Sequence, residues 1–130
     1  MTKILIIEDD PTMQRLYQHA FQLAGYGIDS AKDGSEGLEK VKQFVPDLIF
    51  LDIMMPNMNG IQVLDVLKKD AETKDIPVVM LTNITSGTLE TAELAVKMGA
   101  VRYVIKSEKE PKEMIAIAEE ILKKEPSSCE

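Results

Sequence analysis

The sequence predicts an α/β domain built around a parallel β-sheet. Short apolar segments alternate with longer amphipathic segments five times along the 130 residues, which is the pattern of repeated strand–helix units. The segment 48–51 is apolar at every position, as expected for a central strand that is buried on both faces. Because crossovers between parallel strands are right-handed, we expect helices on both faces of the sheet.

The N-terminal part of the chain predicts a strand, a helix and an edge strand. Residues 4–7 are aliphatic and predict the first strand. Asp10 and Pro11 are residue types that begin helices, and Gly25 is one that ends them. Residues 26–31 alternate only weakly, which is typical of an edge strand. The residues of the intervening helix that recur at helical spacing, and that we expect to face the core, are Met13, Leu16, Tyr17, Ala20, Leu23 and Ala24.

The middle of the chain predicts one helix on each side of the central strand. The earlier helix begins near Asp33 and ends before Pro46. The central strand covers 47–52, and Asn59 is the expected N-cap of the later helix. The apolar residues that we expect to face the core are Leu38, Val41 and Phe44 in the earlier helix and Ile61, Val63, Leu64 and Leu67 in the later one.

The C-terminal part of the chain repeats the same pattern twice. Residues 76–82 and 103–106 predict two further strands. Residues 88–98, which precede Gly99, and residues 111–124 predict the last two helices.

Composition and charge exclude several classes of protein. We expect a single domain over residues 1–125 and a flexible tail over 126–130. The net charge of -7 disfavours direct binding of DNA or RNA. No apolar segment approaches the ~20 residues of a membrane-spanning helix, so we expect no membrane insertion. The single cysteine, Cys129, forms no disulfide within the chain, which fits a reducing cytoplasm.

Reactive side chains stand where the predicted strands end. Glu8 and Asp9 follow the first strand, Asp52 ends the third, Thr82 the fourth and Lys106 the fifth. The carboxyl ends of parallel strands share one edge of the sheet, where ligands bind. If the first and third strands are neighbours, the three carboxylates converge and repel one another. A divalent cation relieves that repulsion, and this set of oxygen ligands suits Mg²⁺.

The same residues indicate phosphoryl-transfer chemistry. Carboxylates such as Asp52 act as nucleophiles that form aspartyl phosphates. Thr82 can donate a hydrogen bond to a phosphoryl oxygen, and Lys106 can pair with another. The cation and Lys106 balance the three carboxylates, so the site can take up a phosphoryl group on Asp52.

Four separated motifs identify a family. ILIIEDD, LDIMMPNMNG, VVMLT and YVIK occur in this order, and over residues 3–124 the chain resembles the receiver domains of two-component response regulators, especially the single-domain receivers of chemotaxis. The resemblance implies a flavodoxin-like sheet with strand order 2-1-3-4-5. It also implies that Asp52 accepts a phosphoryl group from a histidine kinase or a phosphotransfer protein, and that the chain is a phosphoacceptor rather than a dedicated enzyme, supporting its own phosphorylation and dephosphorylation.

The resemblance assigns roles to the other strand-end residues. Thr82 and Lys106 are expected to contact the phosphoryl group, and Thr82 and Tyr103 are expected to act as the conformational switch. The residues that the resemblance places around Mg²⁺ are Glu8, Asp9, Asp52 and, through its backbone carbonyl, Met54.

The sequence departs from the family pattern near the site. Ser107 stands where the family usually has a proline after the lysine, and Asn83 where a smaller residue is usual. Neither Met54 nor Ile84 can orient a water by a hydrogen bond. We therefore expect slow hydrolysis of the aspartyl phosphate.

The expected output is a contact with a partner protein, because no output domain follows residue 124. The expected surface is the 84–124 face, formed by the fourth helix, the fifth strand and the last helix. On the last helix, Ile115 and Leu122 widen the apolar stripe beyond what one face of a sheet needs.

Three other functions were weighed. A flavodoxin binds the FMN phosphate after its first strand, where Glu8 and Asp9 would repel it. A phosphatase of the haloacid dehalogenase type has a second aspartate two residues after the first, where this chain has Met54. A degenerate receiver that binds a partner without phosphate stays open, because Ser107 replaces the usual proline.

Overall fold

The computed structural model describes residues 2–55, 58–83, 88–106 and 110–122. The predicted flexible tail, Ile84 and the departure from the family pattern at Ser107 lie outside these ranges.

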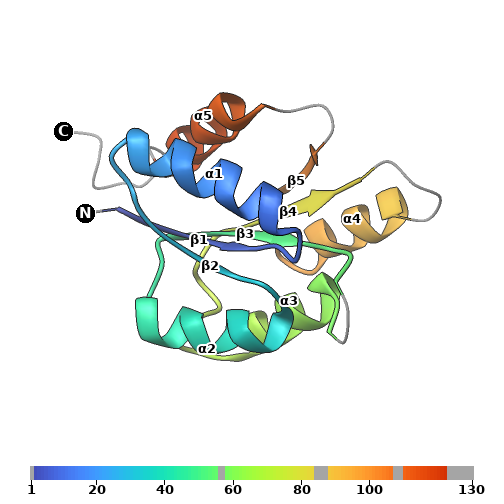
Figure 1. Cartoon of the computed structure of the whole chain (residues 1–130). Coiled ribbons are helices and arrows are strands. Elements are labelled where there is room, and N and C mark those ends of the chain that lie inside the picture. The colour runs from blue at the N-terminus through green and yellow to red at the C-terminus, as the bar shows by residue number, and fades with distance from the viewer. Residues whose placement is uncertain (1, 56–57, 84–87, 107–109, 123–130) are drawn as a thin grey trace.

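The described residues form one five-stranded parallel sheet (Figure 1). Its order is β2-β1-β3-β4-β5, so the predicted order and the α/β fold class are confirmed. The strands are β1 (Lys3–Ile7), β2 (Gly27–Ala31), β3 (Leu48–Asp52), β4 (Val78–Thr82) and β5 (Arg102–Ile105). The helices are α1 (Pro11–Leu23), α2 (Gly34–Phe44), α3 (Gly60–Lys69), α4 (Thr88–Lys97) and α5 (Pro111–Leu122).

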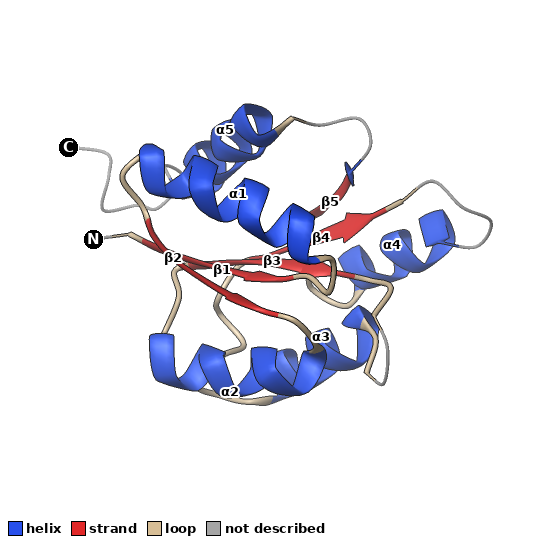
Figure 2. Cartoon of the chain, in the orientation of Figure 1, coloured by secondary structure: helices blue, strands red, loops and turns tan. Residues whose placement is uncertain are grey.

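The helices cover both faces of the sheet (Figure 2). α1 and α5 lie on one face, and α2, α3 and α4 lie on the other. Each face has its own core of buried side chains. The core under α1 and α5 contains the large rings of Tyr17, Phe21 and Phe50. The opposite core is aliphatic, and among the side chains of α4 that the structure describes, Ala92 and Ala95 belong to its buried part.

The buried face of α1 differs from the prediction. Tyr17 and Phe21 are buried, whereas Leu16 and Leu23 are 47% and 76% exposed. Successive residues of a helix are rotated by about 100° around its axis. Because the rings of Tyr17 and Phe21 face the sheet, Leu16 and Leu23 point away from it.

The strand boundaries differ from the predicted ones by one or two residues. β4 begins at Val78, later than the predicted 76, because Pro77 has no N–H for the sheet ladder. β5 ends at Ile105, so Lys106 follows the strand instead of belonging to it.

Side-chain caps hold the helices that flank the carboxyl edge of the sheet. Asp10 is the N-cap of α1, and its carboxylate accepts a hydrogen bond from the N–H of Thr12 at 2.9 Å. Asn59 and Gln62 form a capping box at the start of α3. Within the described ranges, no helix is both long enough and apolar enough to cross a membrane.

Candidate functional site

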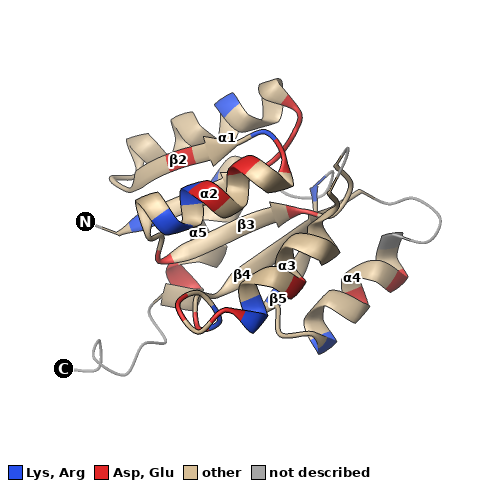
Figure 3. Ribbon diagram, turned by 90° about the horizontal axis from the view of Figure 1, so that it is seen from below, with Lys and Arg blue, Asp and Glu red and all other residues tan. Residues whose placement is uncertain are grey.

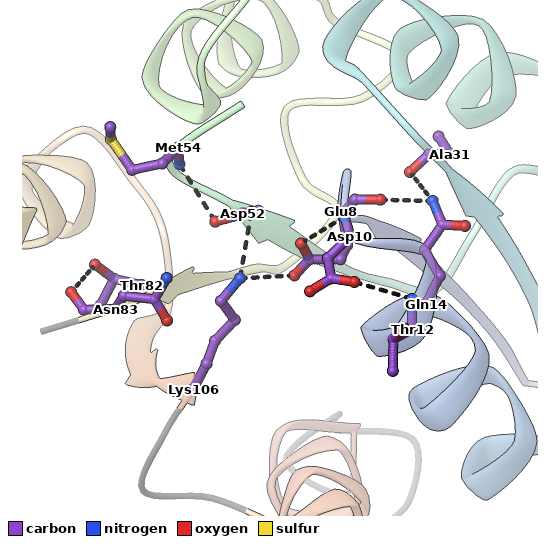
Figure 4. A network of polar contacts seen from close by, with 10 residues as sticks. All are labelled: Glu8, Asp10, Thr12, Gln14, Ala31, Asp52, Met54, Thr82, Asn83 and Lys106. Carbon is purple, nitrogen blue, oxygen red and sulfur yellow. Dashed lines mark hydrogen bonds and ion pairs between the residues drawn. The ribbon is translucent and has the colours of Figure 1, made fainter. Parts of the chain in front are cut away.

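The predicted strand-end residues meet at the carboxyl edge of the sheet. Asp52 pairs in register with Leu81, and Thr82 pairs with Ile105. Figure 3 marks acidic residues in red, one of them at the end of β3. Figure 4 shows Glu8, Asp52, Thr82 and Lys106 around one small volume.

Three carboxylates lie close together at this edge. One oxygen each from Glu8, Asp9 and Asp52 falls within 4.8 Å of the others. Glu8 is fully buried and Asp52 is 3% exposed, whereas Asp9 is exposed. A cluster of oxygen donors that is open to solvent on one side fits Mg²⁺, which keeps several of its waters when bound. The three carboxylates among the predicted metal ligands therefore lie close enough together to suit this ion.

Lys106 joins two of these carboxylates. Its ammonium donates to Glu8 Oε1 at 2.9 Å and to Asp52 Oδ2 at 3.4 Å. The Lys106 side chain is only 9% exposed. Charges that are buried to this degree persist in proteins when they are paired and hydrogen-bonded.

The environment changes the protonation of Asp52. Burial, and then the charge of Glu8, raise the pKa of Asp52 to about 7, although Lys106 acts to lower it. Burial also lowers the pKa of Lys106, but its hydrogen bond to Glu8 and its pairing with Asp52 outweigh burial and raise it. The lysine is therefore cationic at neutral pH. Its single positive charge does not balance both carboxylates, Glu8 and Asp52, when both are ionised.

The loop after Asp52 is held tightly. The N–H of Met54 donates to Asp52 Oδ1 at 3.3 Å, and the N–H of Gly60 donates to the carbonyl of Ile53 at 2.8 Å. A Cβ at Gly60 would lie 2.4 Å from the carbonyl oxygen of Asp52, so only glycine fits this approach. The Met54 side chain is 59% exposed and leaves its backbone facing the site.

Thr82 and Tyr103 occupy positions beside the site. Thr82 is 1% exposed, and its hydroxyl donates to the carbonyl of Asn83 at 3.1 Å. Tyr103 is half-buried on β5 and packs against the core beneath α2, α3 and α4.

The sequence gives no sign of the environment of two residues near the site, Gln14 and Tyr17. Gln14 donates from its side-chain amide to the carbonyls of Glu8 at 2.5 Å and Ala31 at 2.9 Å, which ties the ends of β1 and β2 to α1. Gln14 is a polar residue on an amphipathic helix, and such a residue is ordinarily expected to face solvent, so the sequence does not predict this contact. Tyr17 was assigned only a packing role. Its hydroxyl is buried and has no hydrogen-bond partner among the described residues, and burial raises its pKa to about 12.

A parallel 2-1-3-4-5 sheet with an acidic cluster, a threonine and a lysine at its carboxyl edge is the architecture of a phosphoryl-accepting signalling domain. The family model for the response regulator receiver domain matches residues 4–119. The chain therefore belongs to the response regulator receiver domain family, which acts in two-component signalling. The flavodoxin and phosphatase alternatives are set aside by this match.

Relatives of known name agree with the family. Over 116 residues the chain is 41% identical to the DNA-binding response regulator MtrA of Mycolicibacterium smegmatis, covering 88% of this chain and 47% of MtrA. Over 106 residues it is 40% identical to the DNA-binding dual master transcriptional regulator RpaA of Synechocystis, covering 82% of this chain and 43% of RpaA. The chain thus spans less than half the length of these relatives.

Solved structures show the same fold. Chemotaxis protein CheY4 of Vibrio cholerae superposes with a TM-score of 0.84 at 28% identity, over 93% of this chain and 98% of CheY4. The receiver domain of NtrX from Brucella abortus gives a TM-score of 0.83 at 28% identity with the same coverage. The domain boundary at residue 125 and the cytoplasmic location stay predictions.

Proposed function

We propose that this chain is a phosphorylation-dependent switch in which Asp52 accepts a phosphoryl group from the phosphohistidine of a histidine kinase or a phosphotransfer protein. The observation that carries the proposal is the position of Lys106, whose nearly buried ammonium contacts both Asp52 and Glu8. A fixed positive charge beside a carboxylate nucleophile is what phosphoryl transfer requires, since positioning and charge stabilisation provide most of the catalysis.

Each residue of the site then has a defined task. An ionised oxygen of Asp52 attacks the phosphorus, and the bond from phosphorus to the donor nitrogen breaks with its electron pair staying on nitrogen. Lys106 moves from the carboxylates to an oxygen of the new phosphoryl group. Thr82, which now donates to the carbonyl of Asn83, rotates to donate to another phosphoryl oxygen.

The carboxylate cluster would hold Mg²⁺ during this reaction. When bound, the ion supplies positive charge that favours ionised Asp52 and offsets charge on the phosphoryl oxygens. Its proposed ligands are Glu8, Asp9, Asp52 and the backbone carbonyl of Met54.

The proposed target-binding surface is formed by α4, β5 and α5. Its support comes from α4, where Leu89, Leu94 and Val96 are 45%, 49% and 38% exposed. Ile115 and Leu122 of α5 offer less apolar surface than the sequence indicated, because both are half-buried against the core under α1 and α5. Rotation of Thr82 and Tyr103 is the proposed coupling between Asp52 and this surface.

The test is mass spectrometry of the intact protein after incubation with phosphoramidate. We expect a gain of one phosphate with Mg²⁺ and none with EDTA. Asp52→Asn should abolish the gain. Asp47→Asn is the matched control, because Asp47 precedes β3 at its opposite end and its carboxylate accepts a hydrogen bond from the N–H of Lys3. Equal labelling of Asp52→Asn and the unmodified protein would falsify the proposal.

A second measurement tests the output surface. Chemical-shift changes on phosphorylation should extend from Asp52 into α4 and β5. Changes confined to the residues around Asp52 would contradict the proposed coupling, and a target that binds equally without labelling would favour the phosphate-independent alternative.

A further inference from the structure

We propose that Asp10 makes the site selective for phosphoryl donors whose leaving atom is nitrogen over donors that release a carboxylate. This inference rests on the proposed function of Asp52 and concerns the class of donor that reaches it. Asp10 then has a second role beside capping α1.

A small pocket of about 280 Å³ opens beside Lys106. Lys106 is one of its lining residues, and the Lys106 ammonium is hydrogen-bonded to Asp52. The other lining residues come from the start of α1 and the end of β4, and they are Asp10, Met13 and Asn83. A leaving group departs on the side of phosphorus opposite the nucleophile, and the proposal places the leaving group of a donor that reacts with Asp52 in this pocket.

Two hydrogen bonds hold Asp10, one through its backbone and one through its carboxylate. The N–H of Asp10 donates to Glu8 Oε2 at 3.1 Å, which ties the residue to the acidic cluster. The Asp10 carboxylate accepts from the N–H of Thr12 at 2.9 Å, so it cannot swing away without uncapping α1. Figure 4 shows Asp10 directly beside Glu8 on the side of α1.

The charges around the pocket are unequal. Lys106 is paired with Glu8 and Asp52, and in the proposed reaction it contacts the phosphoryl oxygens. Met13 and Asn83 carry no charge. Of the four lining residues, Asp10 therefore supplies the charge that a leaving group meets.

The two donor classes respond to this charge in opposite ways. In phosphoramidate the nitrogen bonded to phosphorus is protonated before transfer, and in the reactive form of phosphohistidine the other ring nitrogen is protonated, so in both donors the leaving group carries positive charge. The P–N bond breaks, its electron pair stays on nitrogen, and ammonia or imidazole leaves as a neutral molecule. In acetyl phosphate the P–O bond breaks, the pair stays on oxygen, and acetate leaves with a negative charge. A carboxylate beside the leaving group attracts the first donor and repels the second.

The expected effect is measurable even if water surrounds Asp10. Two unit charges about 7 Å apart change a rate by about threefold at the dielectric constant of water, and by more where the pocket excludes water. The effect should shrink as salt is added, because exposed charges are screened.

The experiment compares the two donors in one protein. The rate constants of Asp52 labelling by phosphoramidate and by acetyl phosphate are measured at saturating Mg²⁺. The rate constant for phosphoramidate is then divided by the rate constant for acetyl phosphate. This ratio cancels any change in metal binding or in Asp52 that affects both donors equally. Asp10→Asn is the informative variant, because asparagine caps helices as well as aspartate does and removes only the charge. Asp33→Asn is the matched control: Asp33 caps α2 through the N–H of Glu36 and does not line the pocket.

We expect the ratio to fall by about threefold or more in Asp10→Asn and to stay constant in Asp33→Asn. An unchanged or higher ratio in Asp10→Asn would show that Asp10 is only a helix cap and would overturn the inference, while labelling of Asp52 by both donors would leave the proposed function intact. Failure of both donors to label Asp52 would instead overturn the proposed function, and the inference with it.

Discussion

Replacing Asp52 by asparagine is expected to stabilise the metal-free protein at alkaline pH. The reason is that the folded state holds this carboxylate buried next to Glu8, which raises its pKa from 3.8 to about 7. A carboxyl whose pKa is raised by folding stabilises the protein fully below the unfolded pKa. That stability is lost as the pH rises through the folded value. The unmodified protein should therefore lose stability between about pH 4 and pH 7.

The size of this loss follows from the shift. The change from 3.8 to about 7 is roughly three units and corresponds to roughly 4 kcal/mol as an upper bound, at about 1.4 kcal/mol per unit. Asparagine does not titrate. The free energy of unfolding of Asp52→Asn should therefore exceed that of the unmodified protein by up to about 4 kcal/mol at pH 8 and by little at pH 4.

The assay is urea unfolding in EDTA at several values between pH 4 and pH 8. Asp47→Asn serves as the control for removal of an exposed carboxylate near the same strand. Added Mg²⁺ should restore stability to the unmodified protein at pH 8 and do less for Asp52→Asn. Parallel stability profiles for Asp52→Asn and the unmodified protein across this range would refute the reasoning.

Three further substitutions test other parts of the site. Gly60→Ala should destabilise the protein by about 2 kcal/mol or more in urea unfolding, because its Cβ would meet backbone atoms of Asp52 and Ile53; a neutral result would mean that this loop yields easily. Tyr17→Phe should leave stability unchanged within about 0.5 kcal/mol or raise it, because it removes a buried hydroxyl that has no partner among the described residues; a loss above 1 kcal/mol would reveal a hidden partner. Met54→Asn should speed loss of the phosphate from labelled protein by giving the attacking water a polar contact; an equal or slower decay, followed by mass spectrometry, would contradict the shielding by Met54.

The fold and most of the site were predictable because their signals are local or belong to family motifs. The aliphatic run before Asp52 and the cap at Asn59 identify their elements from neighbouring residues alone. Strand order came from the family resemblance. The support that Gln14 gives to Glu8 could not be read from the sequence, because it depends on where two strands end in space. The exposure of Leu16 also depends on packing, since two rings on the same helix decide which side meets the sheet.

The ion pair between Glu8 and Lys106 joins residues that are 98 positions apart in the chain. Contacts of such long range are slow to form, because most of the intervening chain must first be ordered. Until β5 docks, Glu8 and Asp52 have no lysine between them, and their mutual repulsion disfavours every partly assembled form. During synthesis, a chain that has not yet released Lys106 lacks the cation that completes the site. Under the proposed function, acceptance of a phosphoryl group by Asp52 therefore requires that the end of the first strand and the residue after the last strand have already come together.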